Sequence, residues 1–212
     1  MTRRLFAPLM VAAALVVVVA FLLPTGATAA GERPNVEYSA DQVIEAEAGA
    51  MKARVYSTPT MERREMSQGG MSMIMITRHD KKVIWNLMPE EKMYMEMAMK
   101  TSSDKTDMSA YKIEQTPLGQ EMLDGQSMDK SKIVMTHSSG SKMGGFMWTT
   151  RDGILAKIDA IAVDKGSKDR FKMTQTNIKV GKQPAELFEI PKGFQAMNMG
   201  GMGDMLKGMK GR

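Results

Sequence analysis

Methionine recurs at every second position in two runs between residues 71 and 99, and this spacing constrains the fold more than any other feature. Alternate side chains of a β-strand point to the same face, so each run predicts a strand with one thioether-lined face. Polar segments at 79–82 and 89–92 flank a middle strand and are typical of tight turns. The stretch therefore predicts a three-stranded meander that offers a binding surface. Its methionines are Met71, Met73 and Met75 in the first strand and Met93, Met95, Met97 and Met99 in the third.

Two tryptophans lie in predicted strands. Trp85 shares one face of the middle strand with Val83 and Leu87, and Trp148 lies in a later apolar strand. Aromatic side chains at such positions ordinarily pack in the core, but they also line ligand cavities. We expect both tryptophans to line an apolar binding surface with the seven methionines, and plain core packing is the alternative for each.

The first 29 residues have the pattern of a cleaved secretory signal. Arg3 and Arg4 form a positive start, residues 9–23 are an unbroken apolar run, and residues 27–29 are the small residues that a signal peptidase reads. We expect export to the periplasm with cleavage after Ala29. An uncleaved membrane anchor is the alternative, because the apolar run is nearly long enough to span a bilayer.

Composition excludes several classes of protein. The chain has no cysteine, which excludes a lipid-modified lipoprotein, disulfides and thiolate chemistry. Loss of Arg3 and Arg4 with the leader reduces the formal net charge from +5 to +3, and charges of both signs alternate along the remaining chain. Such a surface does not predict a nucleic-acid partner.

Turn signals divide residues 30–195 into short strands, which we expect to form one domain. Asp-Gly pairs at 124–125 and 152–153 mark hairpins, and strands recur about every 8–12 residues. Residues 61–66 form a charged strand suited to a sheet edge or an outer face, whereas residues 36–48 fit either a helix or a strand. We expect residues 196–212, rich in methionine and glycine, to form a flexible tail. The pattern as a whole predicts a mainly β fold with an antiparallel sheet.

Four segments together resemble a family of exported domains of unknown function in the superfamily of the outer-membrane lipoprotein-sorting proteins (LolA-like). The resemblance extends from about Tyr38 to Phe194. It implies a strongly curved antiparallel sheet, a half-barrel, with one or few short helices covering its concave side. It also implies that the concave apolar surface holds acyl chains or lipidated partners, and it transfers no catalytic or binding residue. The segments are RHDKKVIWNLMPEEKMYMEM, TPLGQEMLDG, WTTRDGILAKIDAI and FKMTQTNIKVGKQPAELFEIPKGFQAM.

The sequence offers little basis for catalysis. His79 and His137 are the only histidines, and neither belongs to a nucleophile motif. The chain carries no phosphate loop, dinucleotide fingerprint or zinc-ligand spacing. We therefore expect no enzymatic activity and no cofactor.

The expected function is non-covalent binding of a lipid or a lipidated molecule by a monomer, with peripheral contact with a membrane. The 23 methionines beyond the leader would supply a deformable apolar lining. Closely spaced thioethers also suit Cu(I), so a methionine-rich Cu(I)-binding protein is one alternative. A structural envelope protein without a ligand is another. A copper protein would keep its methionine clusters exposed, whereas a lipid binder would hide them in a concavity.

The leader yields the first prediction. N-terminal sequencing of the exported protein should begin at Ala30, because the small residues at 27–29 follow the apolar run directly. Recovery of Met1 on the exported protein would contradict cleavage and favour the membrane anchor.

Overall fold

The structure, a computed structural model, describes residues 33–46, 49–68, 71–99, 111–137, 140–164 and 166–197. The predicted leader, the segment 100–110 and nearly all of the predicted tail lie outside the described residues. Within the described ranges, no helix combines the length and the apolar character needed to cross a membrane.

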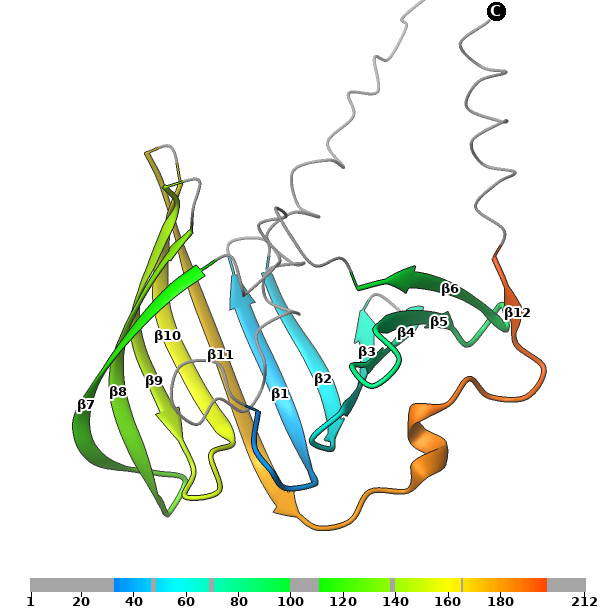
Figure 1. Ribbon diagram of the computed structural model, residues 1–212, viewed down its shortest axis with the longest axis horizontal. Coiled ribbons are helices and arrows are strands. Elements are labelled where there is room, and N and C mark those ends of the chain that lie inside the picture. Colours follow the sequence, from blue (N-terminus) through cyan, green and yellow to red (C-terminus); the bar gives the residue numbers. More distant parts are fainter. Residues whose placement is uncertain are drawn as a thin grey trace, which may run out of the picture. The chain divides into compact units, whose positions relative to one another are not determined.

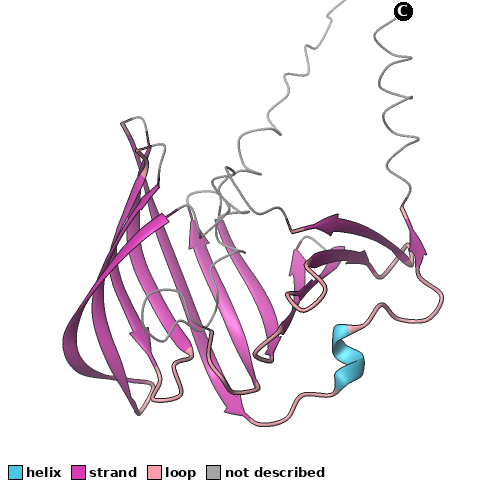
Figure 2. Ribbon diagram, in the orientation of Figure 1, coloured by secondary structure: helices cyan, strands magenta, loops and turns pink. Residues whose placement is uncertain are grey.

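Strands make up almost all of the regular structure (Figures 1 and 2). Neighbours follow the order β12-β6-β5-β4-β3-β2-β1-β11-β10-β9-β8-β7. Successive pairs from β2 to β6 and from β7 to β11 are antiparallel, and β12 joins β6 in parallel. The mainly β, antiparallel fold class expected from the sequence is confirmed. The bounds are β1 Tyr38–Ala46, β2 Gly49–Ser57, β3 Met61–Gln68, β4 Met71–Arg78, β5 Val83–Met88, β6 Met93–Ala98, β7 Tyr111–Leu123, β8 Gln126–His137, β9 Lys142–Thr149, β10 Leu155–Asp164, β11 Ser167–Val180, the 3-10 helix η2 Ala185–Phe188, and β12 Gln195–Ala196.

The chain divides into two compact units. Unit 1 contains Gln42–Met51 and Lys100–Thr176, together with the chain up to Asn35. Unit 2 contains Val36–Asp41, Lys52–Met99 and the chain from Asn177 onward.

Unit 1 is built from the long strands β7 to β11, which form a strongly curled sheet (Figure 1). Apolar residues alternate along these strands and therefore gather on one side, which we call the unit 1 apolar face. All of its members are at most 8% exposed, so this face is the core of the unit. The members are Ile44, Ile133, Met135, Met143, Met147, Leu155, Ile158, Ala160, Phe171 and Met173.

A glycine on β9 sets how closely this strand approaches β10. A Cβ atom added at Gly145 would overlap the backbone oxygen of Asp159 and would lie 2.5 Å from the Cα atom of Ala160. The neighbouring Gly144 has room, because its nearest neighbour would be the Ile133 backbone oxygen at 3.9 Å. The absence of a side chain at Gly145 is therefore required for the pairing of the two strands.

Unit 2 has its core on one face of the strands β3 to β6, where η2 covers it. Ile76 on β4 lies opposite Trp85 on β5, and Leu87 follows on the same face. Phe188 from η2 packs against these side chains and is fully buried. The helix contacts both β3 and β4, so this face of unit 2 is closed.

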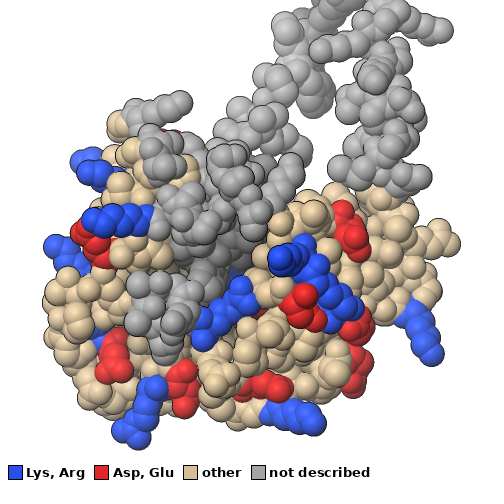
Figure 3. Space-filling model, viewed as in Figure 1, with Lys and Arg blue, Asp and Glu red and all other residues tan. Residues whose placement is uncertain are grey.

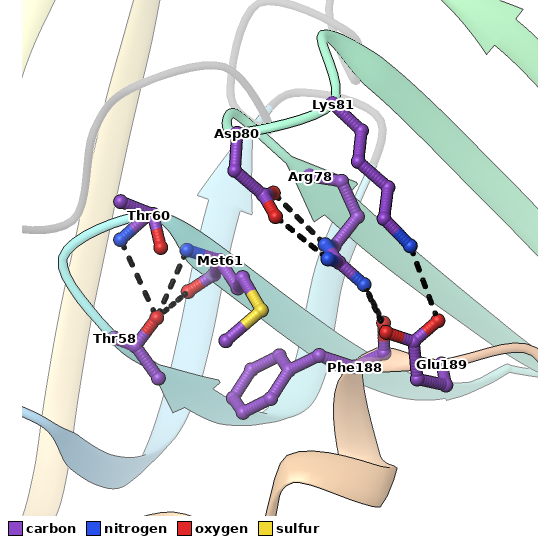
Figure 4. Close-up of polar contacts among 8 residues, drawn as sticks. All are labelled: Thr58, Thr60, Met61, Arg78, Asp80, Lys81, Phe188 and Glu189. Carbon is purple, nitrogen blue, oxygen red and sulfur yellow. Dashed lines mark hydrogen bonds and ion pairs between the residues drawn. The ribbon is translucent and has the colours of Figure 1, made fainter.

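Arg78 fixes the segment after η2 to the sheet (Figure 4). Its guanidinium donates hydrogen bonds to both carboxylate oxygens of Asp80, at 2.9 and 2.6 Å, and to the backbone oxygen of Phe188 at 3.1 Å. It also pairs with Glu189, which accepts a second contact from Lys81 at 3.4 Å. The hydrogen bond from Arg78 lowers the pKa of Asp80 to about 2, so this carboxylate stays ionised at neutral pH.

Residues 61–66 form a strand as predicted, but the expectation of a sheet edge is wrong, and so is that of an outer face for Arg63 and Arg64. β3 pairs with β2 on one side and with β4 on the other. Arg63 is 8% exposed and Arg64 only 1% exposed. Arg63 pairs with Glu65 and Arg64 with Glu62, each at 2.7 Å, and Arg63 also donates to the backbone oxygen of Leu187 at 3.0 Å.

The local turn predictions are confirmed. Residues 79–82 and 89–92 are turns between strands, and so are residues 124–125. The ambiguous segment 36–48 contains the strand β1 rather than a helix, because its Tyr38, Ala40 and Ile44 side chains share one buried side of a sheet strand.

Gly145 yields a second prediction, with its neighbour as the matched control. The substitution Gly145→Ala should lower the free energy of unfolding by about 1–3 kcal/mol, because β9 must shift away from β10 to make room. The substitution Gly144→Ala should change it by less than about 0.5 kcal/mol. Urea unfolding measures both, and equal effects at the two positions would contradict the close approach at Gly145.

Candidate functional site

The unit 1 apolar face is the best candidate for a ligand surface. Four of its ten members are methionines, Met135, Met143, Met147 and Met173, and each is at most 8% exposed. The helix η2 contacts β3 and β4, which belong to unit 2. Methionine side chains are unbranched and deformable, which suits a surface that adapts to flexible apolar ligands.

Two buried glutamines interrupt this apolar surface. Gln42 is 2% exposed and continues the face of β1 that carries Ile44. Gln175 is 3% exposed and follows Met173 on the same face of β11. The Oε1 atom of Gln42 and both polar side-chain atoms of Gln175 have no hydrogen-bond partner among the described residues. Buried polar atoms without partners are costly, so these amides require an explanation.

Contacts between β1 and β11 place the two glutamines at the same level of neighbouring strands. The N–H of Gly181 donates to the backbone oxygen of Glu37 at 2.8 Å, and Asn177 Nδ2 donates to Asp41 at 2.7 Å. Further along, Lys172 Nζ lies 3.2 Å from Glu45. This progression is that of an antiparallel pair, and it brings Gln42 and Gln175 together between the last two contacts. The unit 1 apolar face therefore carries a local group of unsatisfied amide atoms.

The methionines chosen from the sequence lie elsewhere, on unit 2. One face of the sheet carries Met71, Met73 and Met75 of β4 together with Met93, Met95 and Met97 of β6. The register shows this, because Met75 and Met95 both lie opposite Asn86 of β5. Met71 is 72%, Met73 48% and Met97 41% exposed, and the others are half-buried. Met99 follows β6, is half-buried, and its N–H donates to the backbone oxygen of Lys82 at 2.9 Å. The structure brings these methionines together on one face, and Met71, Met73 and Met97 are its exposed members.

Trp85 lies on the opposite face from these methionines. It lies opposite Ile76, within the core that Phe188 covers, and is 6% exposed. Its indole N–H donates to Glu96 at 2.8 Å, and the side-chain cations of Arg78 and Lys81 lie over the ring at 5.7 and 5.2 Å. These contacts assign Trp85 to the core of unit 2.

Trp148 lies on unit 1, on the face of β9 opposite to Met147. It is only 4% exposed because lysine side chains cover its ring, with Lys157 Nζ at 4.3 Å and Lys130 Nζ at 4.9 Å from the ring centroid. Lys130 also pairs with Glu121 at 2.7 Å and lowers the pKa of that carboxylate. Cation–π contacts of this kind stabilise a tryptophan at a polar surface. The nine residues chosen from the sequence are thus distributed over three surfaces, and their contact with a ligand stays a prediction.

The two histidines lie in different units of the described structure. His79 lies in a turn of unit 2 and His137 is buried at the end of β8 in unit 1. No group of three or more His, Cys, Asp or Glu side chains that could hold a metal ion occurs in the described ranges. On the face shown in Figure 3, basic and acidic side chains are interspersed, which does not favour a highly charged partner.

Sequence reasoning missed the unit 1 apolar face because its methionines are spread over several strands. A weak signal was present, since Phe171, Met173 and Gln175 alternate with polar residues. A glutamine that continues an apolar alternation indicates a polar group pointed into a core. Its neighbour Gln42, however, is more than a hundred residues away in the sequence.

The unsatisfied amide yields a third prediction. The substitution Gln175→Met keeps the shape and removes the unpartnered polar atoms, so it should raise the free energy of unfolding by about 1–3 kcal/mol. The matched control is Gln115→Met, since Gln115 Nε2 donates to Ser131 Oγ at 3.0 Å and its loss should destabilise the protein by about 0.5–1.5 kcal/mol. Urea unfolding of the ligand-free protein tests the contrast, and destabilisation by both substitutions would contradict it.

Comparison with known proteins supports the fold and identifies the family. No curated protein matches the chain. The chain is similar to an uncharacterized conserved protein from Thermus thermophilus, at 15% identity and a TM-score of 0.52, over 87% of this chain and 96% of that one. This likeness shows a shared fold.

Two other solved structures are similar at lower TM-scores. The lipoprotein LppX of Mycobacterium tuberculosis has 10% identity and a TM-score of 0.40, over 78% of this chain and 93% of that one. A DUF1329 family protein from Desulfovibrio piger ATCC 29098 has 10% identity and a TM-score of 0.29, over 83% and 96%. The family described as a domain of unknown function (DUF4412) matches residues 42–162, which is more than half of the chain. The protein therefore belongs to the DUF4412 family, and the kinship with a family of unknown function expected from the sequence is confirmed.

Proposed function

We propose that this protein binds a lipid or a lipidated molecule non-covalently, and that the unit 1 apolar face holds its acyl chain. The observation that carries the proposal is the pair of buried glutamines whose Gln42 Oε1, Gln175 Nε2 and Gln175 Oε1 atoms have no partner within an otherwise apolar surface. An apolar surface alone needs no ligand, because core packing explains it. Amide atoms left without partners in that surface are explained when a bound molecule supplies the missing hydrogen bonds.

The unsatisfied atoms indicate the kind of head group. Gln175 Nε2 requires an acceptor, whereas the Oε1 atoms of Gln42 and Gln175 require donors. An acyl amide offers both, since its carbonyl oxygen accepts and its N–H donates. A charged head group fits less well, because burial of a charge among apolar side chains costs far more than burial of a neutral amide. We therefore favour an acyl chain that begins at an amide.

The apolar part of the ligand supplies the larger share of the binding energy. Burial of each CH₂ group contributes about 0.8 kcal/mol, so a long acyl chain gains several kcal/mol on the methionine-rich surface. The two glutamines add orientation, since a hydrogen bond contributes only about 0.5–1.5 kcal/mol. Export by the predicted leader places such binding in the cell envelope, as part of the same proposal.

The proposal yields a fourth prediction, which separates the apolar and polar contributions. The delipidated full chain should bind an N-hexadecanoyl amide more tightly than hexadecane, by about tenfold, because the head group satisfies the glutamines. The double substitution Gln42→Met with Gln175→Met should abolish that preference and leave hexadecane binding intact. Native mass spectrometry with competing ligands measures both quantities.

Methyl-labelled methionine locates the ligand in the same experiment. NMR signals of Met135, Met143, Met147 and Met173 should shift on binding, whereas those of Met71, Met73 and Met97 should not. Shifts of the second group only would overturn the assignment to unit 1 and favour the surface chosen from the sequence. Absence of binding to both ligands would overturn the proposed function and favour a structural role without a ligand.

A further inference from the structure

One face of unit 2 carries methionines in numbers that packing does not explain. We call it the methionine face, and it lies on the side of β3 to β6 away from η2. Its eight methionines are Met66, Met71, Met73, Met75, Met88, Met93, Met95 and Met97. Three of them are 41–72% exposed and the other five are half-buried.

The strand register places four of these side chains in one row across four strands. Met66 lies opposite Met73, and Met88 lies opposite Met93. On β4 and β5, Ile74 lies opposite Leu87. Continuing this antiparallel register by one residue places Met73 beside Met88. Directly opposite residues have Cβ atoms about 4.5–5.5 Å apart, within reach of neighbouring thioethers. We call this set, Met66, Met73, Met88 and Met93, the methionine row.

A second row reinforces the first. Met75 and Met95 flank Asn86 from either side, two residues along the strands from Met73 and Met93. Side chains two residues apart on a strand share a face, so two adjacent rows hold six thioethers, the Asn86 amide and, opposite Met75 at the end of the second row, the side chain of Arg64. The density of sulfur is highest where these rows meet.

The opposite face of the same strands has a different composition. Its buried residues are Ile76, Trp85 and Leu87 under η2, with the half-buried Met61 packed against them. The methionine face also carries Ile84, opposite Met97, and Arg64, opposite Met75, but methionine is its commonest residue. Eight thioethers on one face supply sulfur at a density that suits a soft metal ion.

We propose that the methionine row binds a soft monovalent cation, Cu(I), through three neighbouring thioether ligands. Thioether sulfur prefers Cu(I) over hard divalent ions, and the chain has no cysteine to compete for it. Neutral thioethers do not require deprotonation, so binding is insensitive to pH near neutrality. The site is independent of the acyl site, because the two share no residue.

The test uses Ag(I), a redox-inert soft cation, on the full chain in chloride-free buffer. Methyl-labelled methionine should show shifts at Met66, Met73, Met88 and Met93 on titration with silver nitrate, and Zn(II) should produce none. Competition with a Cu(I) chelator under ascorbate then gives the affinity for copper. Confinement of the Ag(I) shifts to the methionines after residue 197 would overturn the proposal.

Paired substitutions make the test specific to the row. Met73→Leu with Met88→Leu retains the side-chain volume and removes two ligands, so the affinity should fall at least tenfold. The matched control, Met135→Leu with Met143→Leu, alters buried methionines of unit 1 and should leave the affinity unchanged. Equal affinity of the row variant and the wild type would overturn the site. Row shifts caused by anionic phospholipid vesicles but not by Ag(I) would overturn it in favour of a membrane-contact face.

Discussion

The hydrogen-bonded register of the antiparallel strands is the constraint on which the rest of the structure depends. Side chains alternate between faces, so a slip of one residue in β4 would exchange Met73 and Met75 with Ile74 and Ile76. The slip would expose branched side chains and bury thioethers under η2. Tight turns oppose it, and two of them hold a lysine in the left-handed region, with φ of 55° at Lys82 and 51° at Lys92. Such turns fix how many residues separate the strands and thereby fix the faces.

Charged side chains determine which face of unit 2 is closed. Arg63 and Arg78 both donate to backbone oxygens of the segment that carries Phe188. Guanidinium groups suit this role because they offer several donors in a fixed plane and stay charged when partly buried. Their acid partners, Glu65 and Asp80, neutralise them within two residues on the same chain segment. The chain after Val180 is thereby attached to one face of the sheet.

Local patterns in the sequence predicted the strands and the turns. They could not predict which strands, far apart in the sequence, become neighbours in the sheet. Period-two methionines predicted β4 and β6, and the polar segments between them predicted the turns. Alternation cannot tell which face another element will cover, because Phe188 is about a hundred residues from Trp85. It also cannot show that β3 is an interior strand, which is why Arg64 was expected at the surface. The pairing of Gln42 with Gln175 depends on β1 and β11 becoming neighbours, and no local signal specifies that.

The same residue type has two physical environments in this fold, and the environment decides its chemistry. A methionine such as Met173, buried among Ile158 and Phe171, contributes deformable apolar volume, and its sulfur is shielded. A methionine such as Met73, half exposed beside Met66, presents its sulfur to solvent and to its neighbours. Composition alone counts both equally, so lipid binding and copper binding were alternatives at the level of sequence. Once the register assigns the methionines to separate faces, the two proposed functions no longer exclude each other, because neither requires a side chain that the other uses.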